Sequence, residues 1–195
     1  MSPVKEVTMN GFNEIIQTIK GAQAQFPNQQ HRVSLVTFNG LGIRTVLDNR
    51  LAADILPLSD NTYTPDASTP LYDAIGRSLL RLEFQTEGET DPTVLVSILT
   101  DGDENASREF RGGNVKSLVD RLTARGWSFT YMGANHAVES VAASLSIKTS
   151  VRFETNQNSM NELFEKDRKG RLSYFHKRSQ GMSSKDAEKD YWDQK

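Results

Sequence analysis

Apolar residues recur along the chain with two different periods, and these periods predict alternating helices and strands. From Val4 to Ile19 the spacing is mostly three or four residues, which indicates an amphipathic helix from about residue 3 to about residue 25. Similar spacing predicts further helices over about 70–82, 114–124, 136–145 and 158–176. Unbroken or alternating apolar runs instead predict strands over 33–38, 43–47, 93–99, 128–132 and 150–153.

This alternation predicts an α/β fold, with a Rossmann-like, doubly wound and mostly parallel sheet and helices on both faces. The run 94–99 is almost wholly apolar, as is typical of a strand that helices cover on both faces. The dipeptide Asn39-Gly40 is a tight-turn signal between the first two strand-like runs. We therefore expect these two runs to form one antiparallel hairpin at the edge of the sheet.

Apolar periodicity ends near Ser179, and the residues that follow are mainly polar and charged. Such a segment buries little apolar surface and is expected to stay flexible. The sequence therefore predicts a domain over 1–178 and a flexible charged tail over 179–195. Two aromatic residues of this tail, Tyr191 and Trp192, could dock on the domain or on a partner.

Charge and composition narrow the classes of function. The chain has 23 Lys and Arg against 25 Asp and Glu, so its formal charge is −2 and no global basic field attracts nucleic acid or an anionic membrane. No apolar run approaches the roughly 20 residues that a bilayer span needs. The absence of cysteine excludes disulfides, thiolate zinc sites and a cysteine nucleophile. We therefore expect a soluble, cytoplasmic protein with no membrane or nucleic-acid partner.

Polar residues gather just after the predicted strand 93–99. Asp101, Asp103 and Glu104 are three carboxylates within four positions, and open α/β sheets bind ligands at the carboxyl ends of their strands. Carboxylates are hard oxygen ligands that suit Mg²⁺, Mn²⁺ or Ca²⁺. The hydroxyl of Thr69, before Pro70, could also face a cation. Alternatively, these side chains cap helices and face water, and the residues alone leave both interpretations open.

Two segments taken together resemble the von Willebrand factor A domain family: residues 67–75 (ASTPLYDAI) and residues 96–102 (VSILTDG). The likeness covers about residues 3–155, including the opening helix and the hairpin. In that family the strand ends form a metal-ion-dependent adhesion site, whose threonine and aspartate correspond by motif to Thr69 and Asp101. The resemblance implies a Mg²⁺-type ion with one position left for the acidic side chain of a protein partner. It thus implies a non-enzymatic protein-binding module.

The chain departs from the family's pattern at its start. The family's first strand ends in Asp-x-Ser-x-Ser, which supplies the first loop of ligands and lies immediately before the first helix. Here that helix begins at Met1-Ser2, and Ser2 is either a substitute hydroxyl ligand or an ordinary helix cap. Without this normally central strand, two apolar strand edges would face each other unpaired. We therefore expect one of three arrangements: the natural chain starts upstream and contains this strand, the remaining strands close up, or another chain fills the gap. In the chain as given we expect the metal site to be incomplete.

Two other functions compete with the binding module. Asp101-Gly102-Asp103 after a buried strand resembles the nucleophile motif of haloacid-dehalogenase-type hydrolases, which would imply an Asp-dependent, Mg²⁺-dependent phosphatase or phosphotransferase. Those enzymes place this loop after their first strand and follow it with threonine, whereas Glu104-Asn105 follow here. The third hypothesis is a structural scaffold whose site is inactive without its first loop. The order of the motifs favours the binding module over an enzyme.

Overall fold

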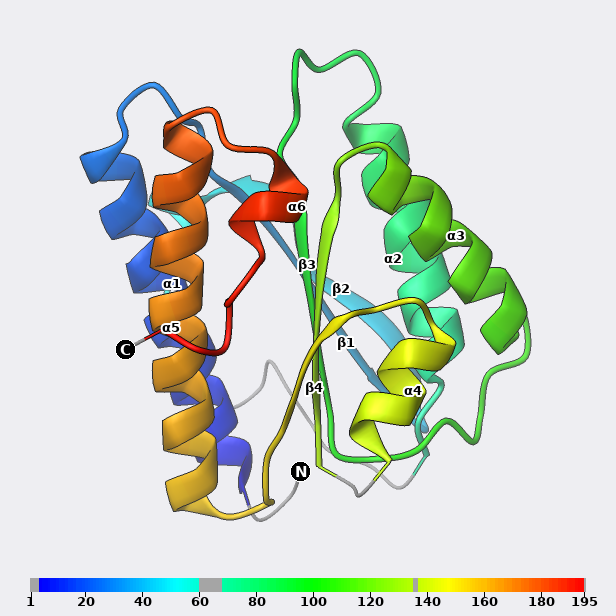
Figure 1. Cartoon of the computed structure of the whole chain (residues 1–195). Coiled ribbons are helices and arrows are strands. Elements are labelled where there is room, and N and C mark those ends of the chain that lie inside the picture. Colours follow the sequence, from blue (N-terminus) through cyan, green and yellow to red (C-terminus); the bar gives the residue numbers. More distant parts are fainter. Residues whose placement is uncertain (1–3, 60–67, 135–136, 195) are drawn as a thin grey trace.

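A computed structural model describes residues 4–59, 68–134 and 137–194, in which helices flank strands on two sides (Figure 1). Over these residues the elements are, in chain order, α1 (Lys5–Gln25), β1 (Arg32–Asn39), β2 (Gly42–Leu51), the 3-10 turn η2 (Ala52–Asp54), α2 (Leu71–Gln85), β3 (Leu95–Thr100), α3 (Gly112–Ala124), β4 (Ser128–Gly133), α4 (Val138–Ser144), β5 (Thr149–Arg152), α5 (Gln157–Ser179) and α6 (Ser184–Ala187). No helix in these ranges has the length and apolar character needed to cross a membrane.

The strands form two sheets. β3, β4 and β5 are parallel, with β4 in the middle, and β1 and β2 form an antiparallel pair. The predicted α/β class, the parallel strands and the antiparallel hairpin are therefore confirmed. Within the described residues no strand pairing joins the hairpin to the three-stranded sheet, so the strands do not form one continuous sheet.

The hairpin turns where the Asn-Gly dipeptide predicts it. Asn39 pairs with Gly42 in the antiparallel register, and Oδ1 of Asn39 accepts a hydrogen bond from the backbone N–H of Leu41 at 2.9 Å. Gly42 has a φ angle of 141°, a conformation that glycine adopts without the steric cost other residues meet. Pairing is irregular between Val33 and Val36, and such bulges increase the twist of a strand.

Two helix layers enclose the parallel sheet (Figure 1). On one side α2, α3 and α4 pack with β3 and β4 into the largest apolar core, which includes Ile75, Ile98 and Val119. On the other side α1 and α5 lie side by side, and a second core joins them to β4. A Cβ atom on Gly11 of α1 would lie 2.1 Å from the ring of Phe164, so this glycine allows the two helices to pack closely.

The segment after α5 packs on the domain, whereas the sequence suggested a flexible tail from Ser179. Ala187 of α6 is buried, and so is Tyr191, which joins Tyr174 of α5 in a third apolar cluster. The hydroxyl of Tyr191 donates a hydrogen bond of 2.8 Å to Oδ1 of Asp167. Trp192 also packs against two apolar clusters of the domain. Periodicity could not reveal this packing, because one short helix and two adjacent aromatic residues produce no periodic pattern.

Candidate functional site

The two sequence-predicted metal ligands lie on neighbouring loops at the carboxyl end of β3. Asp101 and Gly102 directly follow β3, and Thr69 lies shortly before α2. A Cβ atom on Gly102 would lie 2.5 Å from Oγ1 of Thr69, so the threonine hydroxyl lies against the backbone of the Asp101-Gly102 turn. The fold therefore brings together two residues that are 32 positions apart (101 − 69) in the sequence.

Backbone and side-chain hydrogen bonds fix this arrangement. The N–H of Thr69 donates to Oδ1 of Asn105 at 2.8 Å, and the N–H of Asn105 donates to the carbonyl oxygen of Thr69 at 3.2 Å. The hydroxyl of Thr100 accepts from the N–H of Gly102 at 3.2 Å and donates to its carbonyl oxygen at 3.0 Å. These bonds hold the turn after β3 in one conformation beside Thr69.

Glu104 fastens the acidic loop to the start of α2. Its carboxylate accepts hydrogen bonds from the N–H groups of Tyr72 at 2.8 Å, Ala106 at 2.9 Å and Ser107 at 2.7 Å. Burial raises the pKa of Glu104, but these donors outweigh it and hold the pKa below its ordinary value. Glu104 therefore caps backbone groups, which is the alternative to metal binding that the sequence left open. The helix that it caps is α2, not α3, which follows it in the chain.

Thr69 is not the helix cap that its position before Pro70 suggested. No side-chain cap bond is present at Pro70, the N-cap residue of α2. Instead, Glu104 accepts from Tyr72, and the hydroxyl of Ser107 accepts from the N–H of Asp73 at 3.0 Å. Glu104 and Ser107 of the acidic loop therefore cap α2. Thr69 does not have the capping role that is common for a hydroxyl residue at this position.

Asp73 is a second anchor of the loop, and the sequence analysis missed it. Its carboxylate is buried and accepts hydrogen bonds from the N–H groups of residues 108, 109 and 110, at 2.8, 2.9 and 2.7 Å. Burial raises its pKa, but the three backbone donors outweigh burial and leave the pKa below its ordinary value. An acidic residue in the first turn of a helix is common, so only the tertiary contact distinguishes this one.

Tyr131 of β4 lies beneath the same loop. Burial raises its pKa to about 12, and the negative charge of Asp103 and the neighbouring Tyr72 contribute in the same direction. Its ring is buried, so the phenol stays neutral at physiological pH. The negative charge of Asp103 thus adds to the effect of burial on Tyr131.

The described residues contain no complete metal site. No group of three His, Asp or Glu side chains that could hold an ion occurs within the described ranges. Thr69 and Asp101 offer oxygen atoms of the chemical kind that Mg²⁺ prefers, but this ion requires near-octahedral coordination. Ser2, the other hydroxyl considered, lies outside the described residues. Two protein oxygens fit the chemistry of the ion but are too few to bind it tightly.

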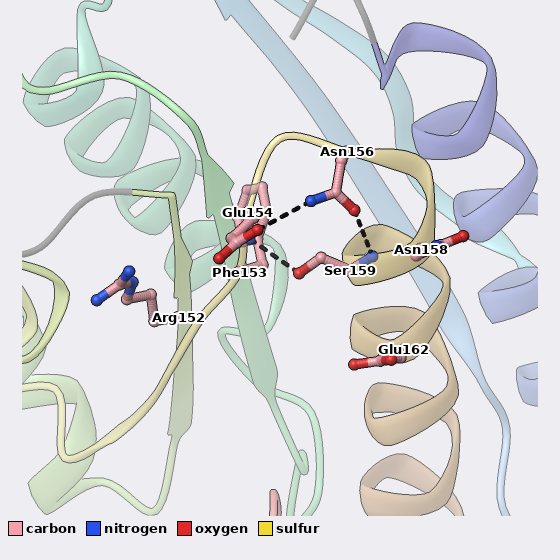
Figure 2. A pocket seen from close by; sticks show the side chains of 7 residues that line it. All are labelled: Arg152, Phe153, Glu154, Asn156, Asn158, Ser159 and Glu162. Carbon is pink, nitrogen blue, oxygen red and sulfur yellow. Dashed lines mark hydrogen bonds between the residues drawn. The ribbon is translucent and has the colours of Figure 1, made fainter.

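An open pocket of about 570 Å³ lies elsewhere, between the end of β5 and the start of α5 (Figure 2). Three of its lining residues hydrogen-bond one another: the N–H of Ser159 donates to Oδ1 of Asn156, and the N–H of Glu154 donates to Oγ of Ser159, both at 2.9 Å. Asn156 is the N-cap of α5. This pocket is therefore built around a helix cap, and neither Thr69 nor Asp101 lines it.

Comparison with known proteins assigns no family. No protein-family model matches the chain, and no curated protein matches it. The likeness to von Willebrand factor A domains therefore depends on the two motifs and on the arrangement of the residues within them.

Gly102→Ala is expected to destabilise the fold by about 1–3 kcal/mol, the usual cost of inserting a methyl group into a packed site. The new Cβ would lie 2.5 Å from Oγ1 of Thr69, so that side chain has to move. Urea denaturation measures the loss. Gly113→Ala is the matched control, because no atom lies within 4 Å of its added Cβ. Equal stability of the two variants would show that Thr69 does not lie against the turn.

Proposed function

We propose that the chain is a non-enzymatic, protein-binding module of the von Willebrand factor A type, with the doubly wound, Rossmann-like arrangement of that family. The α/β architecture, the antiparallel hairpin and the order of the motifs support this proposal. The observation that carries it is the contact of the Thr69 hydroxyl with Gly102, immediately after Asp101. The absence of cysteine agrees with a cytoplasmic location.

In this proposal Thr69 and Asp101 hold a Mg²⁺ ion, or Mn²⁺ or Ca²⁺ in its place. Asp101 supplies a negative charge, and Thr69 supplies a hydroxyl dipole directly or through water. When bound, the ion offers a coordination position to an acidic side chain of the partner. Glu104 and Asp73 act indirectly, because they hold the loop of Asp101 on the start of α2. In this proposal Thr69 and Asp101 therefore contact the ion, and Glu104 and Asp73 position the loop.

The test is calorimetric titration of the protein with Mg²⁺ and with Mn²⁺. We expect weak binding, because two protein ligands leave most of the coordination shell to water. Asp101→Ala should abolish binding and Thr69→Ala should weaken it. Both residues lie in loops rather than in an apolar core, so both variants should remain folded.

Asp120→Ala is the matched control for this titration, because Asp120 lies on α3 and forms an exposed ion pair with Lys116. It should bind the ion as the parent does. If Asp101→Ala also binds as the parent does, the metal assignment is wrong. A generic aryl phosphate supplies the second readout: hydrolysis that depends on Asp101 would favour a phosphatase over a binding module.

A further inference from the structure

The outer face of α2 carries two exposed apolar side chains. Leu80 and Phe84 are 45% and 77% exposed, and they lie four residues apart, so they share one face of the helix. The other large apolar side chains that are exposed in the described part of the chain lie singly in turns and connecting segments. Single exposed apolar residues are ordinary on a protein surface, whereas adjacent ones are typical of a contact surface.

Leu80 also lines an open groove of about 330 Å³ between α2 and α3, which lie side by side (Figure 1). We call it the α2–α3 groove. It is lined by Leu80, Phe110, Asn114, Ser117, Leu118 and Arg121. The groove thus has an apolar part and a polar part, and Phe84 lies one helical turn beyond Leu80.

The apolar part of the groove is held in place by the fold. A Cβ atom on Gly76 of α2 would lie 2.4 Å from the ring of Phe110, so this ring packs directly on the backbone of the helix. Phe110 and Leu118 both pack against the largest apolar core. The N–H of Phe110 donates to the buried carboxylate of Asp73 at 2.7 Å. A ligand therefore meets a preformed apolar surface and does not have to order it, which lowers the cost of binding.

The polar part of the groove carries positive charge. Among the described residues that line the groove, Arg121 alone is charged. It donates to Oε2 of Glu83 at 2.9 Å, and Arg125 donates to Oε1 of the same carboxylate at 2.5 Å. Two half-exposed guanidinium groups thus share one carboxylate, whereas Arg77 and Arg81 of α2 each pair with a carboxylate of their own. This sharing leaves one positive charge for a ligand at the polar part of the groove.

A helix fits this groove better than an extended segment or a small molecule. Within α2 and α3 the backbone groups bond to one another, so neither helix offers the free N–H and C=O groups that an added strand needs. A helical ligand satisfies its own backbone and packs its side-chain ridges between those of the two helices. The volume of the groove is at the low end of the range for small-molecule sites, about 300–1,000 Å³. It therefore suits one side chain that projects from a larger ligand.

The charge favours an acidic partner over a second copy of the chain. Around a two-fold axis, equivalent surfaces of two copies face each other. Association through this face would therefore bring Arg121 and Arg125 of both copies together, and like charges disfavour such a contact. A carboxylate of a different protein would instead complement the arginine pair.

We propose that the α2–α3 groove docks an amphipathic, acidic helix of a partner protein. One apolar side chain of that helix enters the groove beside Leu80, and a second, one turn away, covers Phe84. An acidic side chain pairs with Arg121. Neither Thr69 nor Asp101 lines the groove, so this surface is separate from the candidate metal site and does not depend on it.

The test uses two fluorescent synthetic peptides of about 15 residues, long enough to form an alanine-rich helix. Both carry leucines three or four residues apart on one face. One has glutamates beside the leucines, and the other has lysines at the same positions. Fluorescence anisotropy at low salt should show that the glutamate peptide binds about tenfold more tightly, and high salt should reduce this difference. Binding should be the same in Mg²⁺ and in EDTA.

Two substitutions test the apolar contact. Leu80→Ser and Phe84→Ser should each weaken binding of the glutamate peptide about five- to tenfold, as is usual for an apolar anchor of an interface. Leu56→Ser is the matched control and should bind as the parent does. Leu56 is exposed, but it lies in the other helix layer, because the carbonyl of the adjacent Ile55 accepts a hydrogen bond from Lys20 of α1.

A charge reversal tests the acidic contact. Arg121→Glu should reverse the preference, so that the lysine peptide binds more tightly than the glutamate peptide. Arg168→Glu is the matched control, because it changes the net charge equally and Arg168 also pairs with a glutamate, but it lies on α5. This control should keep the preference of the parent.

No binding of either peptide, or equal binding of both, would overturn the proposal. Loss of binding in EDTA would place the peptide at the candidate metal site and overturn its assignment to the groove. A parent dimer on size-exclusion chromatography that Phe84→Ser converts to a monomer would assign this face to a second copy. Circular dichroism checks the fold of each variant, and Phe84→Ser keeps the test decisive where Leu80→Ser is destabilised, because Phe84 is the more exposed of the two.

Discussion

Asp167→Ala is expected to lower the free energy of unfolding by about 3–5 kcal/mol, the usual loss when one partner of a buried ion pair is removed. Arg171 donates to Asp167 through Nε at 3.1 Å and Nη2 at 3.0 Å, and the two side chains are 8% and 0% exposed. The hydroxyl of Tyr191 also donates to Asp167. The substitution leaves the charge of Arg171 buried without its partner.

Urea denaturation followed by circular dichroism measures this loss. Glu165→Ala is a matched control, because Glu165 lies on the same helix and pairs with Arg168 at 2.7 Å, but both side chains are exposed. Exposed pairs contribute at most about 1 kcal/mol. Similar small losses in both variants would contradict the burial of Asp167 in solution.

Asp73→Ala is the second substitution with a large expected effect, a loss of about 2–3 kcal/mol. It removes the acceptor of three backbone N–H groups in the loop at 108–110. Asp73→Asn keeps one acceptor oxygen and should lose less. Urea denaturation of the parent and both variants gives the three values.

The Asp73 contribution should also depend on pH, because the pKa of its carboxyl is lower in the folded protein than its ordinary value. The charged carboxylate therefore stabilises the fold fully above the ordinary pKa, about 3.9 for aspartate. This stabilisation is lost as the pH falls through the lower pKa of the folded state. The difference in stability between parent and Asp73→Ala should shrink in acid, and a constant difference would refute the explanation.

The sequence predicted the helices and strands well because each produces a periodic apolar pattern. The run 94–99 became β3, and the Asn39-Gly40 dipeptide became the hairpin turn. Periodicity alone did not predict the separation into two sheets, because strand pairing is a tertiary property. The comparison with the resembled family did, because the missing first strand left the facing edges of the hairpin and of β3 unpaired. Docking of Tyr191 on the domain was one of the two alternatives that the sequence suggested. Its hydrogen bond to Asp167 could not be predicted, because Asp167 looks like an ordinary helix-surface residue in the sequence.

The candidate site was predictable only where a motif existed. Thr69 and Asp101 came from the two segments that resemble a known family, and the structure places them on adjoining loops. Which acidic residues fasten the loop to α2 could not be predicted, because the bond between Glu104 and Tyr72 and the bonds of Asp73 cross more than 30 positions. Their hydrogen-bond partners are backbone N–H groups, which every residue except proline has, so residue identity carries no signal.

The hydrogen-bond network of Ser97, Asp167, Arg171 and Tyr191 has a consequence for synthesis on the ribosome. Ser97 and Arg171 are 74 positions apart, and Asp167 and Tyr191 are 24 apart. Contacts this distant in sequence form only after the later residue has emerged, and their loop closure is slow. The nascent chain therefore cannot bury Asp167 with its partners until Arg171 and then Tyr191 have left the exit tunnel, so β3 acquires its final surroundings late in translation.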